Sequence, residues 1–411
     1  MVESQRPKSG GVVILTNRHL SYLVGGREED NRPAPPFCDI RVEFLSALSK
    51  CISQKGHLIR HPDVLTFAFW CRKANITRLR DTFDDGRAHL GLGAVFHVSP
   101  SNVPINFAFS YVFGFLAGNS NYVRLPSHKF PQVDIISSAL NAVLELPDFT
   151  SLKATTHFFR YNHEAEITAE ISAKCQGRVI WGGREAIEEV RKYPIQIRGR
   201  EIGFADRYSF CVLGARTLVE MSRSEMERLA LGFYNDTYLM DQNACSSPHL
   251  VVWLGDLKNV LEAKARFWDC LLLVARRKYE ISTKAVVDKL TLVYQSAIEL
   301  REIGRVHIHN SLLFRVELEA IPDRLDLLRG NCGYFYEFTV QTLDKIAHIV
   351  NSSYQTLTYA GVNRSQLLDF VIENRLSGID RIVPVGTALD IGVVWDGHHM
   401  IQSLSRIIEV R

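Results

Sequence analysis

The sequence predicts an α/β protein that contains parallel sheets covered by helices on both faces. Short apolar runs bounded by Gly or Pro alternate with longer segments in which apolar residues recur at helical spacing. This alternation restarts after Gly203, which indicates two domains. The chain has 411 residues, of which 46% are hydrophobic and 23% are charged. That balance is typical of a folded protein long enough for two cores.

The first series of elements begins with a predicted buried strand over 94–98, which ends at a Ser-Pro turn. Residues 103–117 are too densely apolar for an alternating strand and predict a buried helix, closed by Gly118-Asn119. The rest of the series consists of strand 122–125, helix 132–146, strands 155–160 and 178–181, and helix 184–191. The loop over 25–36 is rich in charge and proline, so we expect it to be disordered.

The second series begins with a strand over 209–213 and a helix that starts at the N-cap residue Ser222. It continues with strand 250–254, helices 257–281 and 283–301, and strand 305–309. We therefore expect a cofactor-binding domain over 1–205 and a catalytic domain over 206–375. A C-terminal segment over 376–411 would return to the first domain or form an oligomer interface.

Composition excludes several classes of function. The net charge is only +3, and no run of Lys and Arg alternates with aromatic residues, so we expect no nucleic-acid partner. The most apolar stretch, 103–117, contains Pro104 and is too short to span a bilayer. The N-terminus has no apolar signal segment, and the eight cysteines include no CxxC pair. We therefore expect a cytoplasmic protein with reduced thiols, and the spacing of His and Cys predicts no metal site.

Four segments suggest chemistry. Cys245 lies between Asp241-Gln242-Asn243-Ala244 and Ser246-Ser247-Pro248, a turn-forming context that can present a sulfur to a cleft. A thiolate is a good nucleophile for acyl transfer, and an amide donor such as Asn102 at the developing oxyanion is worth about 3 kcal/mol. Arg124 could hold a nucleotide cofactor. Gly182-Gly183 stands at a strand-to-helix turn, which either approaches a phosphate or is a plain tight turn.

Taken together, Pro100-Ser101-Asn102-Val103-Pro104, the segment from Gly118-Asn119 to Pro126-Ser127, and Gln242-Asn243-Ala244-Cys245 resemble the aldehyde dehydrogenase superfamily. The sequence is more similar to one branch, the LuxC-type fatty acyl-CoA reductases. That branch shares S-P-S-N-V-P, C-S-S-P and a C-terminal block like Asp380 to Gly397. The resemblance covers roughly residues 85–411. Both branches usually have Lys where this chain has Arg124.

The resemblance implies a Rossmann-like cofactor domain and an α/β catalytic domain. It also implies that Cys245 is the nucleophile, Asn102 the oxyanion donor and Arg124 a contact of the adenosine ribose. Glu201 matches the place of the general base of hydrolytic members. We expect it instead to pair with Arg198, Arg200 or Arg207. The residues expected around the cofactor are Ser99, Pro100, Arg124, Ser127, Gly182, Gly183 and Glu337.

The implied activity is reduction of a fatty acyl-CoA, or of an acyl-protein thioester, to an aldehyde with NADPH. The expected partners are the acyl donor and an acyl-transferase or acyl-protein synthetase, and the resemblance favours a homo-oligomer. One alternative is an NAD(P)-dependent aldehyde dehydrogenase that oxidises aldehyde to acid. Another is a catalytically degenerate scaffold for an acyl-transfer partner, although a scaffold needs neither Cys245 nor Asn102.

Overall fold

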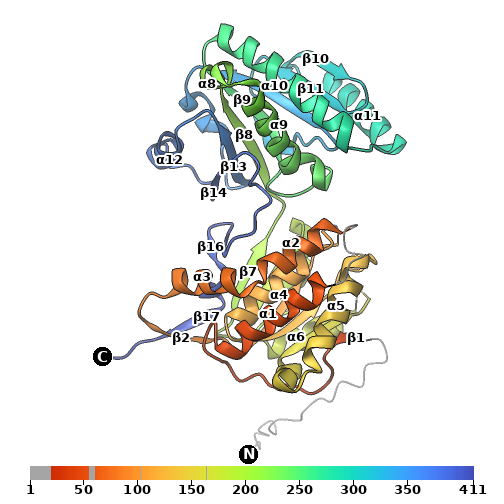
Figure 1. Cartoon of the computed structure of the whole chain (residues 1–411), viewed down its shortest axis with the longest axis vertical. Coiled ribbons are helices and arrows are strands. Elements are labelled where there is room, and N and C mark those ends of the chain that lie inside the picture. The colour runs from red at the N-terminus through yellow and green to blue at the C-terminus, as the bar shows by residue number, and fades with distance from the viewer. Residues whose placement is uncertain (1–19, 55–60, 102, 163) are drawn as a thin grey trace, which may run out of the picture. The chain divides into compact units, whose positions relative to one another are not determined.

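A computed structural model describes residues 20–54, 61–101, 103–162 and 164–411 (Figure 1). The chain divides into two units. The first contains the described part of residues 1–203 together with 401–411, and the second is Phe204–Met400. The chain returns to the first unit later than the expected residue 376, because strand β14 (Arg381–Pro384) still extends the sheet of the second unit.

The first unit is built on a six-stranded sheet in the order β1-β5-β4-β3-β6-β7. Strand β3 pairs in parallel with β4 and β6, and β4 pairs in parallel with β5, whereas β1 runs antiparallel at the edge. The strands are β1 (Ser21–Val24), β3 (Ala94–Val98), β4 (Ser120–Arg124), β5 (Thr156–Arg160), β6 (Gly177–Trp181) and β7 (Arg200–Phe204). This is the strand order of a Rossmann-like domain, in which successive strands are added on one side of β3 up to β5 and then on its other side from β6.

The helices of this unit are α1 (Asp39–Ser53), α2 (Pro62–Trp70), α3 (Lys73–Phe83), α4 (Asn106–Leu116), α5 (Pro131–Leu144), α6 (Ala165–Lys174) and α7 (Arg184–Arg191), with a 3₁₀ segment over Pro147–Thr155. Helix α1 packs against α2, α4 and α5. Helix α4 is buried on nearly every side, as its dense apolar sequence predicts. Within the described residues, no helix is both long and apolar enough to cross a membrane.

Gly118 follows the end of α4, and its backbone conformation and close packing both require a glycine. Gly118 has a φ of +91°, and a Cβ atom at this position would lie 1.9 Å from the carbonyl oxygen of Ala34. The predicted end of the helix at Gly118-Asn119 is therefore confirmed. The backbone of the N-terminal segment at Ala34 packs directly against Gly118, which is a second reason for a glycine at this position. A larger residue would clash with that segment as well as strain the backbone.

The prediction of disorder over 25–36 is wrong. Backbone N–H groups of Asp30, Ala34 and Phe37 donate to the carbonyl groups of Ala154, Gly118 and Leu116. The Tyr122 hydroxyl also donates to the Asn31 side chain at 2.9 Å. Charge and proline indicate disorder only where a segment finds no partners, and here the sheet and helix ends supply them.

A two-stranded ribbon holds the C-terminal segment in the first unit. Strand β17 (Ser405–Ile408) pairs antiparallel with β2 (Ala88–Gly91). The Asn119 side chain stabilises the ribbon, because its oxygen accepts from the backbone N–H groups of Leu92 and Gly93 and its amide donates to the Leu404 carbonyl. The short helix α13 (Met400–Ser403) lies where the chain passes from the second unit to the first.

The second unit contains a seven-stranded sheet in the order β10-β11-β12-β9-β8-β13-β14. All neighbouring strands are parallel except the edge strand β10, which runs antiparallel to β11. The strands not yet given are β8 (Tyr208–Gly214), β9 (Pro248–Leu254), β10 (Ile303–His309), β11 (Leu313–Leu318), β12 (Tyr334–Val340) and β13 (Tyr354–Ala360), with a separate hairpin of β15 (Val394–Trp395) and β16 (His398–His399).

Helices cover both faces of this sheet, so the predicted α/β class is confirmed in each unit. One apolar core contains residues of α9 and α10 and includes Phe233, Trp253 and Phe267. The other lies on the opposite face and includes Tyr208, Tyr336 and Leu357. The helices are α8 (Ala215–Glu220), α9 (Arg223–Thr237), α10 (Leu257–Lys278), α11 (Thr283–Glu299) and α12 (Arg364–Glu373), with 3₁₀ turns over Tyr238–Met240, Leu325–Leu327 and Leu343–Ile349.

Candidate active site

The segment that carries Cys245 connects α9 to β9 in the second unit. Helix α9 begins as predicted at Ser222, which forms a capping box with Glu225. After the 3₁₀ turn, Asp241 and Gln242 have φ values of 51° and 62°, in the left-handed region that non-glycine residues rarely occupy. This reversal turns the chain back toward β9, so Cys245 lies in a tight bend before the strand begins.

The Gln242 amide fixes this bend. Its side chain is 0% exposed, and its Nε2 donates to the carbonyl groups of Pro248 and Tyr334, both at 2.9 Å. Its Oε1 accepts from the backbone N–H groups of Gly333 and Tyr334, both at 3.2 Å. One side chain thus joins the Cys245 segment to the start of β12 and stabilises the left-handed backbone.

Cys245 itself is half-buried. Its carbonyl accepts a hydrogen bond from the Ser209 hydroxyl at 2.7 Å. Burial raises the pKa of the Cys245 thiol and the carboxylate of Asp396 raises it further, whereas a hydrogen bond from the backbone N–H of Arg207 lowers it. The sulfur is therefore held in a defined place and is mostly a thiol before a substrate arrives.

Two other cysteines of the second unit differ from Cys245. Cys211 is fully buried in β8. Burial raises the pKa of its thiol strongly. Cys270 lies on α10 and is half-buried, and burial raises the pKa of its thiol as well. Neither has the bend or the backbone donor that Cys245 has. Cys245 thus remains the best candidate nucleophile among the three.

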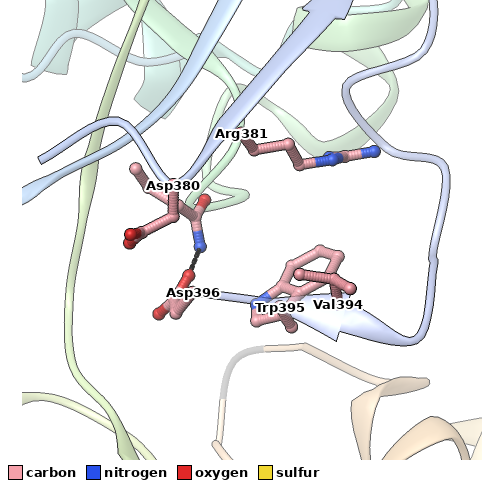
Figure 2. Close-up of a pocket in the computed structure, with 6 residues that line it drawn as sticks. Asp380, Arg381, Val394, Trp395 and Asp396 are labelled. Carbon is pink, nitrogen blue, oxygen red and sulfur yellow. Dashed lines mark hydrogen bonds between the residues drawn. The ribbon is translucent and has the colours of Figure 1, made fainter. Parts of the chain in front are cut away.

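A cavity of about 150 Å³ lies within the second unit, among residues of the C-terminal block (Figure 2). Its lining residues are Gln355, Asp380, Arg381, Val394, Trp395 and Asp396. The Asp396 carboxylate accepts a hydrogen bond from the Gln355 amide and lies 3.3 Å from Nε of Arg207. The charges of this cavity therefore reach the residue whose N–H contacts Cys245.

The predicted cofactor residues of the first unit follow the carboxyl ends of parallel strands, so they share one edge of the sheet. Ser99 and Pro100 follow β3, Arg124 ends β4, and Gly182-Gly183 follow β6 and precede α7. Ser127 is exposed just beyond β4. Ligands of such sheets bind at this edge, at the point where the strand order reverses. Here that point lies between β3 and β6.

Polar atoms at this edge fit a charged ligand. The Ser99 hydroxyl is buried and has no hydrogen-bond partner among the residues that the structure describes. The guanidinium of Arg124 stacks on Tyr161, 4.4 Å from the ring centroid, which orients the cation without neutralising it. Arg160 at the end of β5 has buried Nε and Nη2 atoms that find no partner within the described part of the chain. By strand register it lies on the opposite face from Arg124. We did not single out Arg160 from the sequence, although its place at a strand end was a usable signal.

Gly182 also has a packing role. A Cβ atom at this position would lie 3.2 Å from Cβ of Ala186 in the first turn of α7. Gly183 is the N-cap residue of that helix and has an extended backbone. The turn therefore permits the close approach of strand and helix, and both interpretations of Gly182-Gly183 remain open.

Asn102, the expected oxyanion donor, lies outside the residues that the structure describes. The structure describes its neighbours Ser99, Pro100 and Ser101 on one side and Val103 on the other, in the connection from β3 to α4. The role of Asn102 therefore stays a prediction.

Glu201 does not pair with any of the three arginines that we expected. It lies on β7, where Oε2 accepts from Nε of Arg178 at 2.7 Å and Oε1 accepts from Nε of Arg191 at 2.6 Å. Arg178 comes from the neighbouring strand β6 and Arg191 from the last turn of α7, so both partners are set by sheet and helix packing. With both oxygens in ion pairs, Glu201 stabilises the first unit.

Glu337, expected near the cofactor ribose, lies on β12 with 0% of its surface exposed. Its carboxylate accepts from Nε1 of Trp253 and of Trp268 and pairs with Arg315 and Lys264. These partners occupy both oxygens inside the core of the second unit. The structure thus gives Glu337 the surroundings of a structural ion pair, so we leave it out of the proposed cofactor site.

This architecture defines the aldehyde dehydrogenase fold. A putative aldehyde dehydrogenase from Burkholderia cenocepacia aligns over 90% of this chain and 86% of its own, with a TM-score of 0.62 and 11% identity. An NAD-dependent aldehyde dehydrogenase from Sinorhizobium meliloti aligns over 90% of this chain and 81% of its own, with a TM-score of 0.61 and 12% identity. At this identity the similarity establishes the fold alone, and it confirms the predicted fold class.

The sequence comparisons narrow the class. The family model described as acyl-CoA reductase (LuxC) matches residues 73–289, just over half of the chain, and the chain belongs to this family. A long-chain acyl-protein thioester reductase of Vibrio harveyi is 26% identical over 166 residues, which are 40% of this chain. The matched stretch spans 32% of the length of the Vibrio harveyi protein. The resemblance to the LuxC family seen in the sequence is thus confirmed.

Proposed function

We propose that this protein reduces a fatty acyl thioester, carried by CoA or by a protein, to the aldehyde with NADPH. The observation that carries the proposal is the hydrogen-bonded bend at Cys245 in a chain of the acyl-CoA reductase family. A thioester accepts both a thiol and a hydride at its carbonyl carbon, whereas a free carboxylate must first be activated. The name of the Vibrio harveyi relative supports an acyl thioester as the substrate class.

In the first half of the reaction, the sulfur of Cys245 attacks the thioester carbonyl carbon. The S–H bond of Cys245 breaks, a new C–S bond forms, and CoA leaves as its thiol with the proton. Asn102 and a backbone N–H at Cys245 would stabilise the oxyanion of the tetrahedral intermediate. The hydrogen bond between Ser209 and the Cys245 carbonyl supports this step, because it keeps the segment from moving as charge develops.

In the second half, NADPH, when bound, supplies a hydride to the carbonyl carbon of the acyl-enzyme. Cys245 then carries a hemithioacetal, whose C–S bond breaks to release the aldehyde and return the thiol with one proton from water. Arg124 would hold the adenosine end through its planar guanidinium, and Ser99 and Gly182-Gly183 would lie along the cofactor at the edge of the sheet. The unpartnered Ser99 hydroxyl and the stacked Arg124 support this assignment.

The structure favours reduction over hydrolysis. A hydrolytic dehydrogenase needs a base that activates water, and Glu201 matches that base only in sequence. Each of its two oxygens is in an ion pair, one with Arg178 and the other with Arg191, which makes the carboxylate a weaker base toward water. The acyl-enzyme would then resist hydrolysis until the hydride is transferred.

The test is a product assay with acyl-CoAs of increasing chain length. We expect oxidation of NADPH together with formation of the matching aldehyde, and we expect Cys245→Ala to abolish both. Cys270→Ala is the matched control, because Cys270 is also half-buried and should keep full activity. Formation of carboxylate from aldehyde, without aldehyde from any acyl-CoA, would establish the oxidative alternative. Tight acyl-CoA binding without either reaction would favour the scaffold.

A further inference from the structure

Arg207 connects the C-terminal block to Cys245. It lies between β7 and β8, two residues before Ser209, whose hydroxyl donates to the Cys245 carbonyl at 2.7 Å. The backbone N–H of Arg207 lowers the pKa of the Cys245 thiol. Its guanidinium is held by Asp396 at 3.3 Å and by Asp380 at 3.5 Å, and also donates to the Ser352 carbonyl. The backbone N–H that meets the sulfur therefore belongs to a residue anchored at its other end by three acceptors.

Asp396 is the more deeply placed of the two carboxylates. Its side chain is 2% exposed, whereas that of Asp380 is 30% exposed. Asp396 has a φ of 46° in the turn between β15 and β16. Figure 2 shows its carboxylate within the cavity, where it accepts a hydrogen bond from another lining residue, Gln355. A carboxylate with so little access to water needs such partners, because its burial is otherwise costly.

The charges around the sulfur come from several segments of the second unit. Burial is the first influence on the thiol, and Asp396 is the strongest of the charges that act on it. Asp206, next to Arg207 in the chain, disfavours the thiolate as well, whereas Arg329 favours it. Asp380 also pairs with Arg207, but it is not among the main influences on the thiol. The two carboxylates therefore share a partner and differ in their effect on the sulfur.

We propose that Arg207 and Asp396 are a positioning pair for Cys245, which fixes the backbone N–H at the sulfur and governs how readily the thiol reacts. The pair gives the C-terminal block of the sequence, Asp380 to Gly397, a part in the chemistry through Asp396. Asp396 touches no reacting atom in this scheme and acts through charge and through Arg207. The importance of the pair for catalysis rests on the proposed function of Cys245 as the nucleophile.

The pair has two opposing effects, which substitutions can separate. The negative charge of Asp396 disfavours the thiolate, and the guanidinium of Arg207 partly offsets that charge. Loss of the carboxylate should therefore make the thiol more acidic and more reactive near neutral pH. Loss of the guanidinium should make it less acidic, because Asp396 then acts on the sulfur without compensation.

The experiment measures the rate of alkylation of Cys245 by iodoacetamide as a function of pH, with peptide mass spectrometry to separate Cys245 from the other cysteines. Asp396→Asn keeps the shape and can still accept from Gln355, so its alkylation midpoint should move to lower pH. Its rate at pH 7 should rise roughly threefold or more. Arg207→Gln should move the midpoint to higher pH. Asp380→Asn is the matched control and should leave the midpoint at the parent value.

An unchanged midpoint in Asp396→Asn, or an equal shift in Asp380→Asn, would overturn the proposal. If Asp396→Asn does not fold, the opposite shift in Arg207→Gln decides the question. Alkylation requires neither acyl-CoA nor NADPH, so its outcome is independent of the product assay. If the alkylation midpoints shift as predicted but the protein has no reductase activity, the positioning pair is supported and the proposed function is refuted.

Discussion

The Gln242 side chain provides a sharp test of how the Cys245 bend is held. Gln242→Ala removes four hydrogen bonds, two donated to the carbonyl groups of Pro248 and Tyr334 and two accepted from Gly333 and Tyr334. At about 1 kcal/mol for each bond, the second unit should lose about 4 kcal/mol of unfolding free energy. The left-handed backbone at residue 242 does not reduce this loss, because alanine is as strained as glutamine in that conformation.

A second substitution separates hydrogen bonding from packing. Gln242→Glu keeps the shape and the two accepted bonds but removes both donors and introduces a charge into a site with 0% exposure. It should destabilise the second unit at least as much at neutral pH, and less as the pH falls and the carboxyl group takes up a proton. Gln295→Ala, at an exposed glutamine on α11 of the second unit, is the control and should change stability by less than about 0.5 kcal/mol.

The assay is urea titration combined with hydrogen exchange, which reports the unfolding transition of each unit from its own backbone amides. Only the transition of the second unit should move in the Gln242 variants. A loss of less than about 1 kcal/mol in Gln242→Ala would refute the reasoning, because it would mean that the four bonds do not hold the bend.

Four further outcomes follow from the site and the fold. Arg124→Gln should shift the kcat/KM preference from NADPH toward NADH, and an unchanged ratio would remove Arg124 from the cofactor site. Asn102→Ala should lower kcat by roughly 10²–10³ with little change in KM, whereas proportionate loss with a lowered Tm would indicate a structural role. Glu201→Gln should leave the slow hydrolysis of the acyl-enzyme unchanged but cost about 1–3 kcal/mol, because Arg178 is 3% exposed and loses its ion pair. Burial lowers the pKa of His97 from 6.5 to about 4, so the folded state binds fewer protons between these values and the first unit loses up to about 3 kcal/mol as pH falls through them. In urea titrations His97→Gln should flatten that slope, and a parallel slope would contradict the assignment.

Most strands and helices from residue 94 to residue 309 could be predicted from the sequence because each is a strong apolar run with a local stop signal, whereas the more polar elements α6 and β7 and the short helix α8 were not predicted. Ser222 shows this well, since its capping box with Glu225 starts α9 at the expected residue. Gly118 shows it at the other end of a helix. Such signals are local, so they can be recognised in the sequence without knowledge of the rest of the fold.

The partners of charged residues could not be predicted in the same way. Arg207 and Asp396 are separated by 189 positions, and only the folded sheet and the β15–β16 hairpin bring them together. Glu201 pairs with Arg178 and Arg191 and not with arginines that are nearer in the sequence, because strand pairing and the last turn of α7 place these two side chains beside it. Glu337 looked like a ligand contact in sequence but is enclosed by two tryptophans and two cations. A sequence supplies the charge of such residues but not the distances between them.

The central claim is that Cys245 forms a covalent acyl-enzyme, and peptide mass spectrometry after incubation with an isotopically labelled acyl-CoA tests it most directly. In the absence of NADPH, one acyl group should appear on the peptide that contains Cys245, and addition of NADPH should remove it as labelled aldehyde. Cys245→Ala should carry no label, while Cys270→Ala should be labelled like the parent protein. Label on another cysteine, or full reductase activity in Cys245→Ala, would contradict the account.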